Sequence, residues 1–109
     1  MDAGEQLADE LPDAVYVQGD ISDKAAAAAL VDAAQQRWGR LDGLVNNAAV
    51  TVEVPLAAVD DVTVEHWRRV LDVNVVGTFL VSQAALPLLR EADDGPSWWT
   101  AASAWCSEA

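Results

Sequence analysis

Asparagines at two places in this chain, the pair Asn46–Asn47 and the single Asn74, could take part in binding or catalysis. Asn46 and Asn47 follow the apolar residues Leu44 and Val45, which are expected to form a buried strand. Ligands of open α/β sheets bind at the carboxyl ends of strands, where this pair lies. Asn74 interrupts an apolar helical stripe, and a buried amide there costs about 1–3 kcal/mol if it lacks a partner. The alternatives are a strand-end turn for the pair and a helix-to-helix hydrogen bond for Asn74.

The other reactive side chains give weaker signals. His66, the single histidine, is expected to be a solvated residue in the first turn of a helix rather than a ligand or a base. The acid pairs at 60–61 and 93–94 could bind a hard cation, but they are typical of turns beside helices. Cys106 is the single cysteine, which excludes an internal disulfide framework and a multi-thiolate metal site. We therefore predict no metal site.

Composition excludes several classes of protein. The 109 residues are 52% hydrophobic, so the chain has material for a core and is not disordered by composition. Eighteen acids against six Lys and Arg give a net charge of −12, which opposes binding to nucleic acid or to an anionic membrane surface. There is no unbroken apolar run near the ~18 residues of a membrane span, and no signal peptide is recognisable. We expect a cytoplasmic protein.

Strands and helices are predicted to alternate along the chain. A helix near 6–11 ends at Pro12 and is followed by a strand over 14–18, a helix over 24–38 and a strand over 41–47. Thr63 is the predicted N-cap of a long helix over 63–90, and Pro87 should kink or end its last turn. This order predicts an α/β fold with a parallel sheet. Two strands do not make a stable sheet, so part of the sheet is missing.

Three segments resemble the short-chain dehydrogenase/reductase family. Gly-Asp-Ile-Ser-Asp at 19–23 resembles the loop after the family's third strand. The sequence at 41–49 resembles the fourth-strand motif Asn-Asn-Ala-Gly, with Ala49 in place of glycine, and 67–79 resembles the long helix with the catalytic asparagine. The resemblance covers about 5–95. It implies a partial Rossmann-type, doubly wound parallel sheet with two helices, containing strands three and four and leaving strand five open. This sheet lacks the first two strands and the C-terminal part.

The resemblance also implies roles in binding NAD or NADP. Asp20 would accept a hydrogen bond from the adenine amino group, with the Ile21 amide nearby. Asn46, Asn47 and Ala48 would tie the fourth strand to its neighbours and line the adenosine ribose. The residues that discriminate NAD from NADP lie outside the resemblance, so the choice between them is left open.

Catalytic roles are implied for two further residues. Asn74 would hold a water molecule in the proton relay, and Ser103 stands where the family's catalytic serine follows strand five. In the family these groups support hydride transfer between a nicotinamide cofactor and a small alcohol or carbonyl substrate. The sequence leaves the substrate open.

Two parts of the family pattern are absent from this sequence. The glycines are scattered, so no Gly-rich loop can cradle the pyrophosphate. Tyr16 is the only tyrosine and Lys24 the only lysine, and their spacing does not match the family's Tyr-x-x-x-Lys. The general acid and the cation that lowers its pKa are therefore missing. We expect the chain to be inactive in hydride transfer by itself.

The end of the chain departs from the family as well. A Val-rich fifth strand is expected after Gly95, but the sequence at 97–101 is Ser-Trp-Trp-Thr-Ala. Two GTG valine codons read one base out of phase give TGG TGG, which encodes Trp-Trp. We therefore divide the chain into a partial NAD(P)-binding Rossmann domain at 1–95 and an aberrant tail at 96–109, translated out of frame. The alternative is a genuine, divergent fifth strand.

Two functions follow from these observations. The first is a fragment of an NAD(P)-dependent oxidoreductase that is inactive by itself. The alternative is a non-catalytic α/β interaction module, which forms a homo-oligomer by pairing through the helix at 63–90. That helix has a wide apolar face, which fits packing against two partners.

Overall fold

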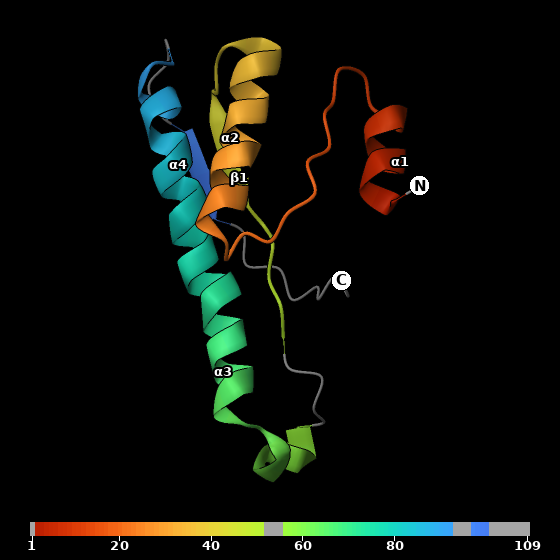
Figure 1. The fold of residues 1–109 in the computed structure, drawn as a ribbon, viewed down its shortest axis with the longest axis vertical. Helices are drawn as coiled ribbons and strands as arrows, with labels where there is room; N and C mark the ends of the chain where they lie inside the picture. Colours follow the sequence, from red (N-terminus) through yellow and green to blue (C-terminus); the bar gives the residue numbers. More distant parts are fainter. Residues whose placement is uncertain (1, 52–55, 93–96, 101–109) are drawn as a thin grey trace.

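Helices make up most of this computed structural model, and they lie beside a short parallel pair of strands (Figure 1). The structure describes residues 2–51, 56–92 and 97–100. In chain order the elements are α1 (Ala3–Glu10), α2 (Lys24–Trp38), β1 (Gly43–Asn46), the 3-10 helix η1 (Leu56–Asp61), α3 (Val64–Leu71), the π-helix η2 (Asp72–Gly77), α4 (Thr78–Arg90) and β2 (Ser97–Thr100).

The predicted helix over 24–38 is confirmed, and local capping explains both of its ends. Asp23 is the N-cap, and its carboxylate accepts a hydrogen bond from the main-chain N–H of Ala25 at 3.2 Å. Gly39 ends the helix in the left-handed region, with φ 72°, and its N–H donates to the carbonyl of Gln35 at 2.8 Å. The helix buries Ala27 and Val31.

The long helix is continuous from Val64 to Arg90, so the predicted helix over 63–90 is also confirmed. Thr63 is its N-cap: the Thr63 Oγ1 accepts from the His66 N–H at 3.2 Å, and His66 Nδ1 accepts from the Thr63 N–H at 3.1 Å. This reciprocal pair is a capping box in which histidine replaces the usual Glu or Gln. The half-buried His66 therefore has a structural role that the sequence did not predict. The helix ends three residues after Pro87.

The parallel sheet consists of β1 and β2 in the described part of the chain. Gly43 pairs with Ser97 and Asn46 with Thr100, so β1 is shorter than the predicted strand over 41–47. The predicted strand over 14–18 is wrong. Those residues form an extended connection between α1 and α2 (Figure 1). A strand needs a hydrogen-bonded neighbour, and the described sheet contains only β1 and β2.

The core forms where α2 and α4 lie side by side and cover β1 (Figure 1). Its buried residues are Val31, Ala85, Leu88 and Leu89, and Leu41, Leu44 and Ala84 pack against them. The first part of the long helix leaves apolar side chains exposed, among them Val64, Trp67, Leu71, Val75 and Phe79. The fold therefore buries apolar side chains at 81–89 of this helix and leaves an open apolar stripe at 64–79.

This long helix is also apolar enough to cross a membrane, judged by length and composition alone. Its most apolar window has a mean hydropathy of 1.4, and 22% of that window is buried. The sequence-based exclusion of a spanning segment therefore does not hold for Val64–Arg90 on this criterion. Core helices of other proteins pass the same test.

Candidate functional site

The loop before α2 holds the carboxylate of Asp20 in a fixed position. Asp20 Oδ1 accepts hydrogen bonds from the hydroxyl of Ser22 at 2.7 Å and from its main-chain N–H at 2.9 Å. The carbonyl of Asp20 accepts from the N–H of Asp23 at 2.9 Å, which closes the turn into α2. The Ser22 hydroxyl, the Ser22 N–H and the Arg69 guanidinium lower the pKa of Asp20 to about 2. The carboxylate is therefore ionised near neutral pH while its side chain is 46% exposed.

Two contacts attach this loop to the long helix. Arg69, in the last turn of α3, donates from Nη1 to Asp20 Oδ2 at 2.9 Å. At the other end of η2, Gly77 is buried against Ile21, and a Cβ on Gly77 would lie 2.7 Å from Ile21 Cγ1. Only glycine lets the loop approach the helix this closely without a shift. The predicted cofactor residues Asp20 and Ile21 are thus both held by the helix that contains Asn74.

Asn74 ties the same helix to the loop that follows β1. Its Oδ1 accepts from the Val50 N–H at 2.8 Å, and its Nδ2 donates to the Val50 carbonyl at 2.9 Å. The predicted alternative of a helix-to-helix hydrogen bond is therefore wrong, and main-chain groups of Val50 satisfy the half-buried amide. The carbonyl of Asn74 also accepts from Thr78 Oγ1 at 3.2 Å. Asn74 lies within the π-helical turn η2, a form that is frequent at functional sites.

The two asparagines after Val45 differ in solvent exposure. Asn46 is buried at the end of β1, and its Nδ2 donates to Ser82 Oγ of α4 at 3.1 Å. Asn47 and Ala48 are exposed beyond it. Asn46 therefore joins the strand to α4. Ser103 lies outside the described residues.

The long helix thus brings together the three segments that carry the resemblance, since it contains 67–79 and contacts the other two at residues 20–21 and at Asn46. Residue 50, just after the segment at 41–49, also meets the helix at Asn74. Sequence reasoning missed Arg69, because a charged residue in a helix is usually solvated. It also missed Gly77, although a glycine inside a helix costs about 1 kcal/mol relative to alanine, and that cost was a usable signal.

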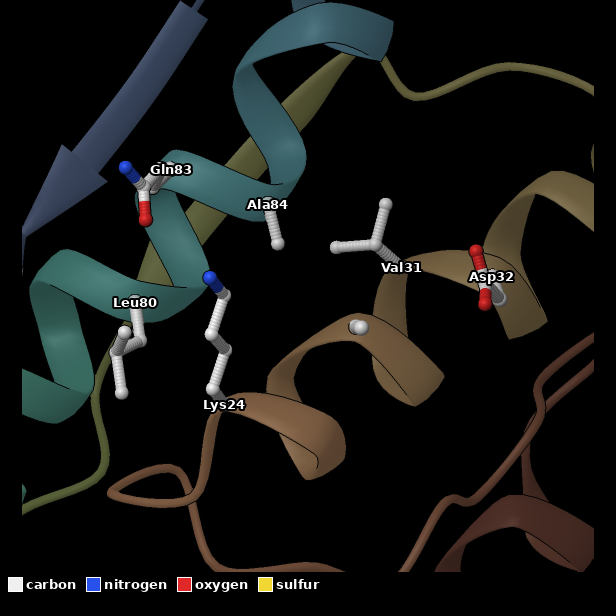
Figure 2. Close-up of a pocket in the computed structure, with 7 residues that line it drawn as sticks. Lys24, Val31, Asp32, Leu80, Gln83 and Ala84 are labelled. Atoms are coloured by element: carbon white, nitrogen blue, oxygen red, sulfur yellow. The ribbon is translucent and has the colours of Figure 1, made fainter.

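Two open grooves flank α4. One of about 570 Å³ lies between α4, η2 and β1, and its lining includes Thr78, Phe79, Ser82 and Leu86. The other, of about 350 Å³, lies between α2 and α4. Figure 2 shows Lys24 reaching from the start of α2 toward Leu80 and Gln83. Neither groove is lined by Asp20 or Asn74.

The Asp20 carboxylate is accessible to a ligand. It is ionised and partly exposed, and it can accept a hydrogen bond from an amino group. In residues 2–51, 56–92 and 97–100, no cluster of three or more His, Cys, Asp or Glu side chains could hold a metal ion.

Comparison with known proteins gives one consistent family. A family model described as Enoyl-(Acyl carrier protein) reductase matches residues 1–104. A Streptomyces violaceoruber protein named as a ketoacyl reductase of the granaticin polyketide synthase is 47% identical over 92 residues, which are 84% of this chain and 37% of that protein. The 3-alpha-(or 20-beta)-hydroxysteroid dehydrogenase of Mycobacterium bovis is 38% identical over 93 residues, covering 84% of this chain and 35% of that protein.

A solved structure agrees with these relatives. The 3-ketoacyl-(acyl-carrier-protein) reductase of Brucella melitensis, complexed with NADH, is similar with a TM-score of 0.73 and 35% identity. The match covers 81% of this chain and 36% of that one. The chain thus spans well under half the length of these proteins, and the match supports an α/β fold of the same kind.

Proposed function

Because this chain belongs to the short-chain dehydrogenase/reductase family, we propose that it is the central piece of an NAD(P)-dependent oxidoreductase domain. The relatives support the general oxidoreductase kind. In this proposal the chain contributes strands three and four of the family's sheet, without the first two strands and the C-terminal part. The observation that carries the proposal is the junction at η2, where Asn74 holds Val50 and Gly77 admits Ile21.

The chain's residues would hold one end of the cofactor. Asp20 accepts a hydrogen bond from the adenine amino group, and Asn46 fixes β1 so that Asn47 and Ala48 face the adenosine ribose. The NADH complex of the Brucella melitensis relative supports a nicotinamide cofactor, and either NAD or NADP fits these residues. When bound, that cofactor supplies or accepts a hydride.

Asn74 would serve the proton relay. Its two bonds to Val50 fix the side chain and leave a second N–H of Nδ2 for a water molecule. Ser103 would stand beside the substrate, which is a small alcohol or carbonyl compound. The sequence has no Tyr-x-x-x-Lys to protonate that substrate and no Gly-rich loop to cradle the pyrophosphate. We therefore propose that the chain alone does not turn over.

Turnover and binding of the purified chain test this function separately. We expect no NADH or NADPH oxidation with a carbonyl substrate, and weak binding of NADH that adenosine displaces. An Asn74→Leu variant should weaken binding by releasing the loop at Val50, and Gln36→Leu on the exposed side of α2 is the matched control. Measurable turnover would contradict inactivity. No NADH binding at millimolar concentration would contradict the cofactor role.

A non-catalytic interaction module is the second candidate, favoured by the open face of the long helix. Trp67, Leu71, Val75 and Phe79 are between 48% and 61% exposed and follow one another at four-residue spacing. A second copy of the chain could cover this stripe. Sedimentation of Leu71→Lys should then show dissociation, whereas Val59→Lys, on an exposed valine of η1, should not. A folded oligomer without NADH affinity would favour this candidate over the first.

The tail and the cellular location stay proposals. The parallel pairing of β2 with β1 and the family match as far as residue 104 support a genuine fifth strand at 97–100. If the tail is translated out of frame, the alternative reading frame after the Gly95 codon should encode a Val-rich strand and a Tyr-x-x-x-Lys. Sequencing the gene decides between them. We also propose a cytoplasmic location.

A further inference from the structure

A carboxylate, a hydroxyl and a guanidinium meet between the loop before α2 and the last turn of α3. Asp20 Oδ1 accepts two hydrogen bonds, both from Ser22, at 2.7 and 2.9 Å. Asp20 Oδ2 accepts one, from Arg69 Nη1 at 2.9 Å, and the same Nη1 lies 3.4 Å from Ser22 Oγ. An ionised carboxylate offers about four acceptor positions, two on each oxygen. Oδ1 is therefore filled, and Oδ2 has room for one more donor.

Charge decides which donor this position accepts. The guanidinium of Arg69 offsets the negative charge of Asp20, so the pair attracts a cation or a metal ion much less than a lone carboxylate would. A neutral N–H donor gains a charge-assisted hydrogen bond from the same oxygen. Because the two side chains are 46% and 53% exposed, a ligand can reach them. The cluster therefore favours a neutral amino group over an ammonium group.

Packing fixes the distance that Arg69 must bridge. Ile21, next to Asp20, is seated in the space that a Cβ on Gly77 would fill. Gly77 and Arg69 belong to one continuous helix, so the loop cannot move away from Arg69 without losing the Ile21 contact. The guanidinium thus meets a carboxylate that is already held by Ser22.

We infer that Arg69 is a positioning and specificity residue for the nucleotide base: it directs Asp20 Oδ2 to accept one hydrogen bond from a neutral exocyclic amino group, as on adenine. This inference rests on the proposed function, since it names how the base is chosen at the same site. Arg69 lies within the segment at 67–79, but it is not among the cofactor-binding residues that the resemblance implies. Lysine can make the same single contact to Oδ2, whereas methionine cannot.

Adenosine and purine riboside, which lacks the 6-amino group, are the probes for this inference. Binding to the full chain is measured by NMR, following the Asp20 carboxyl carbon and the Ser22 amide. We expect the native chain to prefer adenosine by about tenfold or more, as loss of a hydrogen bond to a charged group implies. Arg69→Met should reduce the preference to about twofold, and Arg69→Lys should retain most of it. Arg68→Met removes the same charge one residue away and should keep the native preference.

Different results would refute the proposed cofactor role and the role of Arg69. A native chain that binds neither nucleoside refutes the proposed cofactor role and, with it, base selection. A native chain that binds both equally refutes selection by Asp20. If the native chain and Arg69→Met prefer adenosine over purine riboside equally strongly, only the role of Arg69 is refuted. A carboxyl titration of Asp20 that is unchanged in Arg69→Met would refute the ion pair itself.

Discussion

Replacing Gly77 by alanine tests whether close packing holds the loop before α2 against the long helix. A Cβ at this position would lie 2.7 Å from Cγ1 and 2.9 Å from Cδ1 of Ile21, and 3.1 Å from the Ile21 carbonyl carbon. Carbon atoms in good contact are about 3.5–4.0 Å apart. The Ile21 side chain must therefore leave its position, or the loop must move with it.

Two opposing terms set the size of the effect. Extra carbon in a packed site costs about 1–3 kcal/mol, whereas alanine in place of glycine inside a helix gains about 1 kcal/mol. We expect Gly77→Ala to lower the free energy of unfolding by about 0–2 kcal/mol. In an Ile21→Ala background the two closest contacts are gone and only the 3.1 Å contact with the main chain remains, so the same substitution should cost less or stabilise the chain. The coupling between the two positions should be about 1–3 kcal/mol.

Urea denaturation of four chains measures this coupling: native, Gly77→Ala, Ile21→Ala and the double variant. The tertiary signal is followed by tryptophan fluorescence and the helix by circular dichroism. Gln83→Gly compared with Gln83→Ala, at an exposed position of the same helix, calibrates the helix propensity in this protein. If Gly77→Ala changes the free energy of unfolding equally in the native and the Ile21→Ala backgrounds, close packing against Ile21 is refuted.

Three further predictions concern the neighbouring contacts. Asn74→Ala removes both bonds to Val50 and should lower the free energy of unfolding by about 1–3 kcal/mol, with faster hydrogen exchange at the Val50 amide; unchanged exchange would contradict the loop attachment. Since the pKa of Asp20 is lowered from 3.8 to about 2, its contribution to stability is complete above pH 4 and lost as pH falls from about 4 toward 2. Because the carboxylate is half-exposed, that contribution should stay below about 1 kcal/mol, and Asp20→Asn should flatten this part of the stability–pH curve; an unaltered curve would contradict it. His66→Ala should cost about 0.5–2 kcal/mol by breaking the capping box with Thr63, while His66→Gln should cost little; equal losses would assign the effect to something other than the cap.

Features that depend on neighbouring residues in the sequence could be predicted well. Asp23 and Gly39 bound α2 because an N-cap side chain and a left-handed C-cap act within four residues of the helix end. Thr63 begins the long helix for the same local reason. The resemblance at 19–23, 41–49 and 67–79 added the family, which the comparisons then supported.

Features that depend on a distant partner could not be predicted. The residues at 14–18 have strand-forming side chains, yet a strand exists only beside another strand. The partner of Asn74 is a main-chain group 24 residues earlier, and no sequence pattern marks Val50 as that partner. Arg69 reaches Asp20 across 49 residues, and it resembles any solvated helical arginine until the fold brings the two together.

The π-helical turn at 72–77 has a consequence for insertions and deletions in this chain. A π turn contains about one residue more than an α turn, and each residue of an α-helix rotates the chain by about 100°. Removing one residue between Leu71 and Thr78 would let the segment become regular α-helix while the parts before and after it keep their angular relation. Removing a residue from the regular α-helix on either side would instead rotate the following part by about 100°. The π turn is therefore the place where this helix should tolerate the loss of one residue best.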